Sequence, residues 1–145
     1  MSRWAGPLSI VDSVKRLSDV NEGIPMKYML LVHHDEEIFG TFSETKRQQM
    51  LEESVQLTHQ LHAKGKYLSA SPLHPASTAA VVRVRDGKSF VTDGPFIETR
   101  EQIAGYFLIE ANSLDEAIGI AARIPMARKG TVEVRPVIEI PGLPT

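Results

Sequence analysis

The residues whose types best suit chemistry lie in one stretch, VTDGPFIETREQIAGYFLIE, which spans residues 91–110. Two of its acids, Asp93 and Glu98, lie on either side of a Gly-Pro turn, and Arg100 follows them. A carboxyl group whose pKa is shifted by burial or by a neighbouring charge can act as a general acid or base, and arginine can bind an anionic substrate. We predict Asp93 and Glu98 as catalytic residues. The alternative is a structural ion-pair network that steadies the turn.

Other residues are predicted to bind a substrate without taking part in the reaction. Glu133 and Arg135 are two residues apart in a predicted strand, so their side chains share one face of the sheet. His34 ends another predicted strand, and His74 lies in a loop, at places where side chains often line a cavity. The predicted substrate-binding residues are Arg135, Glu133, Arg100, Phe96, His74 and His34.

Patterns that hold metals or nucleotides are missing from the sequence. His59 and His62 are three residues apart on a predicted helix, but no HExxH pattern accompanies them, so we predict that they are solvated surface residues. The chain has no GxGxxG or GxxxxGK[ST] loop and no serine nucleophile elbow. The sequence therefore predicts neither a metal nor a cofactor.

Composition narrows the classes that remain. With 145 residues the chain suits one domain, and its net charge of -2 comes without a basic patch, so we do not expect nucleic-acid binding. There is no cysteine, which excludes disulfides and thiolate nucleophiles and fits a cytoplasmic protein. No apolar run approaches the roughly 20 residues of a membrane span, and the N-terminus does not resemble a signal peptide.

The elements that must position these residues follow from periodicity and caps. Ser43 is a plausible N-cap and Gly65 a plausible C-cap of one helix, while Ser113 and Glu116 form a capping-box pattern at the start of another. Asp86-Gly87 marks a tight hairpin turn. The predicted helices span residues 43–64 and 113–124, and the predicted strands span 26–33, 67–73, 79–85, 89–92, 103–109 and 131–138.

This order of elements predicts the fold class. It contains two β-α-β halves with short connections and a hairpin inserted between them. We predict an α+β protein: a ferredoxin-like sandwich whose mostly antiparallel sheet carries two helices on one face. The single domain is expected over residues 26–145.

The first 25 residues differ from the rest of the chain. Residues 9–17 suit one short amphipathic helix, and a strand then starts abruptly at Met26. Residues 1–25 are either a native extension or a segment upstream of the true start at Met26, and both readings stay open. Such a segment is expected to be weakly ordered.

Two predicted strands are apolar on both faces. Tyr28, Leu30 and Val32 alternate with Met29 and Leu31. In the strand 103–109 we expect Ile103, Phe107 and Ile109 on one face and Ala104, Tyr106 and Leu108 on the other. Helices cover only one face, and a large exposed apolar patch is rare on a soluble monomer. We predict a homodimer, with two sheets face to face around a cavity; the alternative is that residues 1–25 cover this face.

The turn itself has a structural interpretation. Gly94 permits backbone angles that other residues avoid, and Pro95 favours an extended residue before it. Asp93 is expected to accept backbone hydrogen bonds as in an Asx-turn, and Phe96 to be a hydrophobic plug. Residues 98–102 are expected to form one helical turn with acids near its start.

The stretch Asp93-Gly94-Pro95-Phe96, continuing through residues 98–101 to Gly105-Tyr106, resembles the signature of DGPF-type proteins in the YCII-related family. The similarity covers about residues 26–139, and Arg100 stands where lysine is usual. It implies a dimeric α+β barrel. Most DGPF-type proteins are uncharacterised, and some are encoded beside extracytoplasmic-function sigma factors.

The wider family also includes a dehydrochlorinase and proteins with a proposed His–Asp pair. Its histidine would correspond to Met50 in this chain and its aspartate to Ile124. Both members of the pair are therefore replaced, and the dehydrochlorinase chemistry is not transferred.

Two functions remain open. One is a cofactor-independent lyase, isomerase or hydrolase that binds a small polar or anionic molecule in the cavity between subunits. The other is a non-catalytic binding or regulatory module, which the resemblance links to sigma-factor signalling. A carboxyl group desolvated in a cavity would favour the enzyme.

Overall fold

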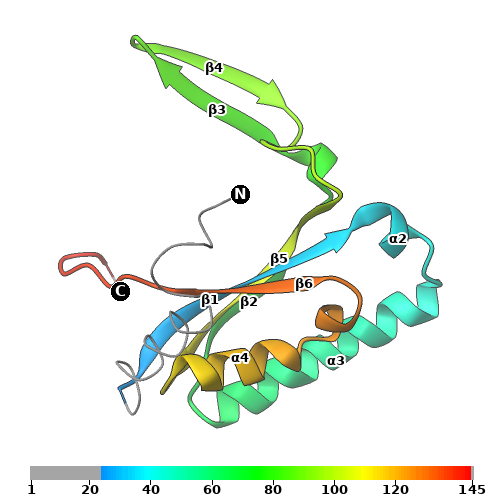
Figure 1. The fold of residues 1–145 in the computed structure, drawn as a ribbon, viewed down its shortest axis with the longest axis vertical. Coiled ribbons are helices and arrows are strands. Elements are labelled where there is room, and N and C mark those ends of the chain that lie inside the picture. The colour runs from blue at the N-terminus through cyan, green and yellow to red at the C-terminus, as the bar shows by residue number, and fades with distance from the viewer. Residues whose placement is uncertain (1–23, 145) are drawn as a thin grey trace, which may run out of the picture.

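A computed structural model describes residues 24–144, and the helix expected at residues 9–17 lies outside this part of the chain. The chain folds into a four-stranded antiparallel sheet and a separate hairpin, with the helices α3 and α4 on one side of the sheet (Figure 1). The strands are β1 (Met26–Asp35), β2 (Tyr67–Pro72), β3 (Ala80–Arg85), β4 (Lys88–Asp93), β5 (Glu101–Ala111) and β6 (Thr131–Pro136). The helices are α2 (Glu36–Gly40), α3 (Glu44–Ala63) and α4 (Leu114–Ala122), with short 3-10 turns η2 (Ala76–Thr78) and η3 (Pro125–Arg128).

The strand order is that of a ferredoxin-like sandwich. The sheet runs β2-β5-β1-β6, so each β-α-β half places its two strands around a strand of the other half. The hairpin β3–β4 is inserted between β2 and β5 and extends away from the sheet (Figure 1). The predicted α+β class and the order of elements are confirmed. The short helix α2 was not predicted.

The helix ends follow the predicted signals. Ser43 accepts a hydrogen bond from the backbone N–H of Lys46 at 3.1 Å, and Ser113 accepts one from Glu116 at 3.1 Å. Each bond satisfies an N–H that has no partner within its helix. Gly65 follows α3 with a φ of 71°, the left-handed conformation that favours glycine.

A β-bulge in β5 reverses part of the predicted face pattern. Val32 pairs with Gly105 and the next residue of β1, His33, pairs with Ile103, so Ala104 is the extra residue. Ile103 therefore shares a face with His33 and not with Phe107, and the predicted faces of Ile103 and Ala104 were wrong. A bulge shifts the alternation by one residue, which periodicity alone does not reveal.

The face of the sheet opposite α3 and α4, here called the open face, carries apolar side chains as predicted. Tyr28, Leu30 and Val32 are buried beneath the helices, and the residues between them point the other way. The open face presents the half-buried residues Met29, Leu31, Tyr106 and Leu108, with Ser69, Glu133 and Arg135 around them.

The turn after β4 differs from its prediction in three respects. Residues 98–100 form no helix, and Glu101 already begins β5. Among the described residues no hydrogen bond to the Asp93 carboxylate is found; instead the N–H of Gly94, at a φ of 95°, donates to Ala79 O at 2.7 Å. Phe96 is 66% exposed rather than a plug, and the guanidinium of Arg83 lies 5.3 Å from its ring centre. The backbone hydrogen bond from Gly94 to Ala79, and not the Asp93 side chain, closes this turn.

Gly130 sets how closely the start of β6 approaches the end of β1. An added Cβ at this position would collide with the carbonyl oxygen of His33 and lie 3.2 Å from Cα of His34. Gly130→Ala should therefore lower the free energy of unfolding by about 1–3 kcal/mol, because backbone must move. Urea unfolding measures this change. Gly119→Ala in α4, where a Cβ meets nothing within 4 Å, is the control and should be neutral or stabilising.

Candidate functional site

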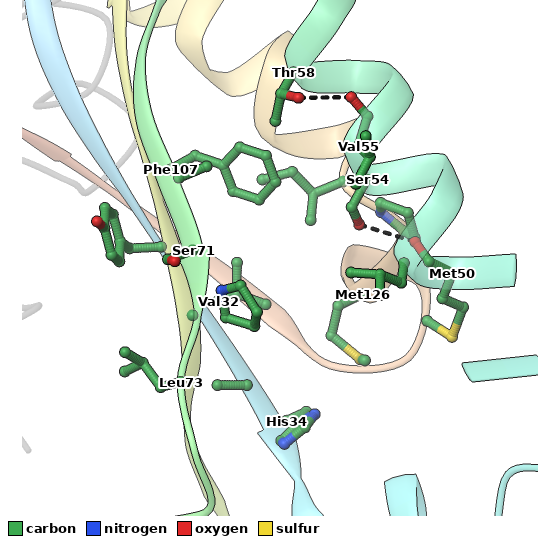
Figure 2. Close-up of a pocket in the computed structure, with 18 of the residues that line it drawn as sticks. Val32, His34, Met50, Ser54, Val55, Thr58, Ser71, Leu73, Phe107 and Met126 are labelled. Atoms are coloured by element: carbon green, nitrogen blue, oxygen red, sulfur yellow. Dashed lines mark hydrogen bonds between the residues drawn. The ribbon is translucent and has the colours of Figure 1, made fainter. Parts of the chain in front are cut away.

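A cavity of about 350 Å³ lies between α3 and the sheet, on the helix side (Figure 2). One wall is the inner side of α3 with Met50 and Val55, the opposite wall is β5 with Phe107, and η3 contributes Met126. Leu73, after β2, lies along the sheet wall with its side chain directed away from α3 (Figure 2). The volume lies within the range of natural small-molecule pockets, and the lining is mainly apolar.

His34 brings an imidazole to this cavity. Strand alternation places it on the same face of β1 as Leu30 and Val32, next to the helices. Its ring centre lies 4.7 Å from that of Phe39 in α2. The Nδ1 atom is buried and has no hydrogen-bond partner among the described residues. A buried polar atom that the protein leaves unpaired is costly, which makes it a candidate to bind a ligand.

The protonation of His34 is set mainly by burial, which lowers its pKa below the usual 6.5, while Glu36, Asp35 and Glu101 act in the opposite direction. The unfolded chain therefore binds more protons than the folded chain just below pH 6.5, so stability falls as the pH is lowered through this window. Its contribution is complete above pH 6.5.

An NMR titration of the His34 ring should accordingly have its midpoint below pH 6.5. Glutamine does not titrate, so His34→Gln should lose less stability than the natural protein when urea unfolding is repeated on acidification below pH 6.5. A midpoint above 6.5 would show that the three carboxylates outweigh burial.

Three other polar side chains that line the cavity already have hydrogen-bond partners. The hydroxyl of Ser54 donates to Met50 O at 3.0 Å, and that of Thr58 donates to Val55 O at 2.6 Å, both within α3 (Figure 2). Arg47 donates to Phe42 O at 2.8 Å and to Glu44 at 2.9 Å. Among the described residues that line the cavity, His34 alone has a buried side-chain nitrogen or oxygen without a hydrogen-bond partner.

The predicted catalytic acids lie elsewhere. Asp93 is exposed at the end of β4, opposite Ala80 in the hairpin. Glu98 and Arg100 are exposed and line a shallow hollow with Glu36 and Glu37 of α2. Among the described residues no hydrogen bond or ion pair joins Asp93, Glu98 or Arg100 to one another or to β6. The roles predicted for these residues remain predictions.

Glu133 and Arg135 do lie together, on the open face. One carboxylate oxygen of Glu133 lies 3.2 Å from His33 Nε2 in β1, and the other lies 3.4 Å from Arg135 Nη1 in β6. The carboxylate therefore contacts an imidazole and a guanidinium at once. Both side chains of the Arg–Glu pair are largely exposed, and such pairs contribute little to stability. His74 is exposed in the loop after β2. Of the predicted substrate-binding residues, His34 alone lines the cavity between α3 and the sheet.

Sequence reasoning missed most of the cavity wall. Phe39 belongs to a short helix that periodicity does not detect, although Asp35 caps it by accepting from Glu37 N at 2.9 Å. Met126 belongs to η3, behind Pro125. Asp35 two residues before Glu37 was a cap signal that could have been read. Met50 and Ile124, the positions that correspond to the His–Asp pair of the wider family, both line the cavity.

Residues 24–144 offer neither a metal cluster nor a membrane-spanning helix. No cluster of three or more His, Cys, Asp and Glu side chains suited to a metal ion is present there. In the same part of the chain, no helix has the length and apolar character needed to cross a membrane. His59 and His62 are exposed on α3, as predicted.

Fold and cavity together define an α+β protein of the ferredoxin-like type with a small-molecule-sized pocket beside its sheet. The sequence model of the YCII-related domain family matches residues 26–141, and the chain belongs to that family. It is also 34% identical, over 113 residues, to an uncharacterized protein of Rhizobium meliloti (strain 1021), an alignment that covers 77% of this chain and 91% of the relative.

Proposed function

We propose that this YCII-related protein binds a small organic molecule in the cavity between α3 and the sheet, with His34 as its polar contact. The observation that carries the proposal is the buried, unpaired Nδ1 of His34 in an apolar cavity of about 350 Å³. The sequence favoured a polar or anionic molecule held between subunits. The position and lining of the cavity instead support a site within each protomer.

The proposed assembly is a homodimer of the DGPF-type subgroup, built by packing two open faces together. Its support is the row of Met29, Leu31, Tyr106 and Leu108 on a face that α3 and α4 do not cover. A second copy would bury this row, and each such side chain moved out of water is worth about 1.5–3 kcal/mol when fully buried. The resulting dimeric α+β barrel would be a cytoplasmic protein, in keeping with its lack of cysteine.

The chemistry proposed for the site is proton transfer without a cofactor, as in a lyase, isomerase or hydrolase. A neutral imidazole donates a hydrogen bond from one ring nitrogen and can accept a proton from a substrate at the other, and burial favours the neutral form of His34. Asp93 and Glu98 stay as the alternative acid–base pair, acting at the mouth of an inter-subunit cavity.

A second candidate is a non-catalytic regulatory module linked to sigma-factor signalling. It is favoured by the hairpin, where Val82, Val84 and Val91 are 58–64% exposed. Val82 pairs with Val91, and Val84 lies on the same face of β3. An isolated two-stranded ribbon is marginal in water, and a protein partner would bury these valines.

A thermal-shift screen with a metabolite library tests the first function. Compounds that stabilise the natural protein should stabilise His34→Gln less and leave the response of His59→Gln, altered on the exposed side of α3, unchanged. Hits that stabilise all three proteins equally would place the binding site elsewhere. A protein partner captured through the hairpin, with no compound binding, would favour the regulatory module.

A further inference from the structure

The chemistry of the cavity restricts the ligand, provided that the proposed function holds. We infer that the site takes an uncharged, mainly apolar molecule with one hydrogen-bond acceptor, which accepts from Nδ1–H of His34, and that it discriminates against carboxylates.

The walls set the size and character of the ligand body. Met50 and Val55 of α3, Phe107 of β5 and Met126 of η3 surround the space (Figure 2). Its volume of about 350 Å³ equals roughly a dozen water volumes at about 30 Å³ each, enough for a single ring with a short chain. Apolar walls favour an apolar body, and a charged group buried among them would lose its hydration without replacement.

The hydroxyl groups of α3 do not offer protons to a ligand. Ser54 and Thr58 donate to carbonyl oxygens of their own helix, so they present only acceptor capacity to the cavity. Tyr106 also turns its hydroxyl to Ser69, 3.1 Å away on the open face. Ser54, Thr58 and Tyr106 therefore offer no free hydroxyl hydrogen to an anion in the cavity.

The charges around His34 oppose an anion. The carboxylates of Asp35, Glu36 and Glu101 all act on the imidazole, and burial, the larger effect, lowers its pKa below 6.5. The nearest lining cation is Arg47, 6.0 Å from the Phe39 ring that also contacts His34. Nη2 of Arg47 already forms an ion pair with the Glu44 carboxylate at 2.9 Å, and Nη1 donates a hydrogen bond to Phe42 O. A carboxylate placed beside His34 would meet more negative than free positive charge.

A matched set of probes separates these effects. 4-Phenylbutan-2-one, 3-phenylpropanamide and 3-phenylpropanoate have nearly the same shape, but only the last is charged, and butylbenzene supplies the body without a polar group. Methionine methyl groups report where each probe binds. The chain has 5 methionines, of which Met50 and Met126 line the cavity and Met29 lies on the open face.

In methyl NMR titrations, the ketone and the amide should shift Met50 and Met126 but not Met29. 3-Phenylpropanoate should bind at least about tenfold more weakly, since an uncompensated buried charge costs more than a lost neutral hydrogen bond. His34→Leu should weaken the ketone by about threefold to tenfold and leave butylbenzene unchanged, and His34→Gln should restore part of the loss.

The outcomes distinguish the ligand class from the site. If the carboxylate binds as tightly as the ketone at Met50 and Met126, the cavity is a binding site but the inferred class is wrong. If no probe, including butylbenzene, shifts these methyl groups at millimolar concentration, or if Met29 responds instead, the proposed site fails and the inference with it. If His34→Leu weakens the ketone and butylbenzene equally, the substitution has damaged the cavity, and His34→Gln becomes the deciding variant. If His34→Gln keeps the natural ratio of ketone affinity to butylbenzene affinity, the hydrogen bond is supported. If that ratio falls to the value of His34→Leu, the hydrogen bond is refuted.

Discussion

Replacing Leu31 with lysine should turn the protein from a dimer into a monomer. Leu31 is the central apolar residue of the open face, opposite Tyr106 in β5 and Glu133 in β6. In the dimer the new ammonium would be buried beside Glu133, whose carboxylate already contacts His33 and Arg135. A buried charge without a free partner costs about 3–5 kcal/mol, and a symmetric interface would contain the change twice. The dimer dissociation constant should therefore rise by more than about a hundredfold. In the monomer the new ammonium stays exposed beside Glu133, so the fold should survive.

Sedimentation velocity at micromolar concentration measures the change. The natural protein should sediment at twice 16.0 kDa and the variant at 16.0 kDa. Ile118→Lys, at a 42% exposed position of α4, is the matched control and should remain dimeric. A natural protein that sediments only at 16.0 kDa would refute the proposed dimer directly.

Replacing Val55 with tryptophan should abolish most ligand binding while leaving the fold intact. Val55 is 46% exposed and lines the cavity from α3, so a larger side chain at this position fills space that a ligand would use. Forcing extra volume into an occupied site costs about 1–3 kcal/mol, so affinity for 4-phenylbutan-2-one should fall at least about tenfold.

Isothermal titration with the ketone measures this loss, and far-ultraviolet circular dichroism confirms the fold. His59→Trp, which adds the same ring to the exposed side of α3, should bind the ketone normally. Unchanged affinity in Val55→Trp would mean that the ligand occupies another surface.

The frame of the fold was predictable because its signals are local. Ser43, Gly65 and Ser113 mark helix ends through backbone hydrogen bonds and a left-handed residue, and the structure confirms each one. The face of β1 followed from simple alternation. The face of Ile103 did not, because the bulge at Ala104 depends on how β1 and β5 pair across a long sequence separation.

The candidate site was predicted less well for a related reason. Sequence reasoning concentrated on Asp93, Glu98 and Arg100 because they are adjacent in the chain. The cavity instead combines single residues from elements distant in the sequence, such as His34, Val55 and Phe107. For most of these residues the sequence pattern predicts an ordinary core position. His34 was included as a strand-end residue, but its ring contact with Phe39 involves α2, which periodicity did not reveal.

The most direct measurement of the central claim is a crystal structure of the protein grown with 4-phenylbutan-2-one. We predict density for the ketone between Val55 of α3 and Phe107 of β5, with its carbonyl oxygen within hydrogen-bonding distance of His34 Nδ1. Density on the open face between two protomers, beside Arg135 and Glu133, with nothing bound beside His34, would contradict it.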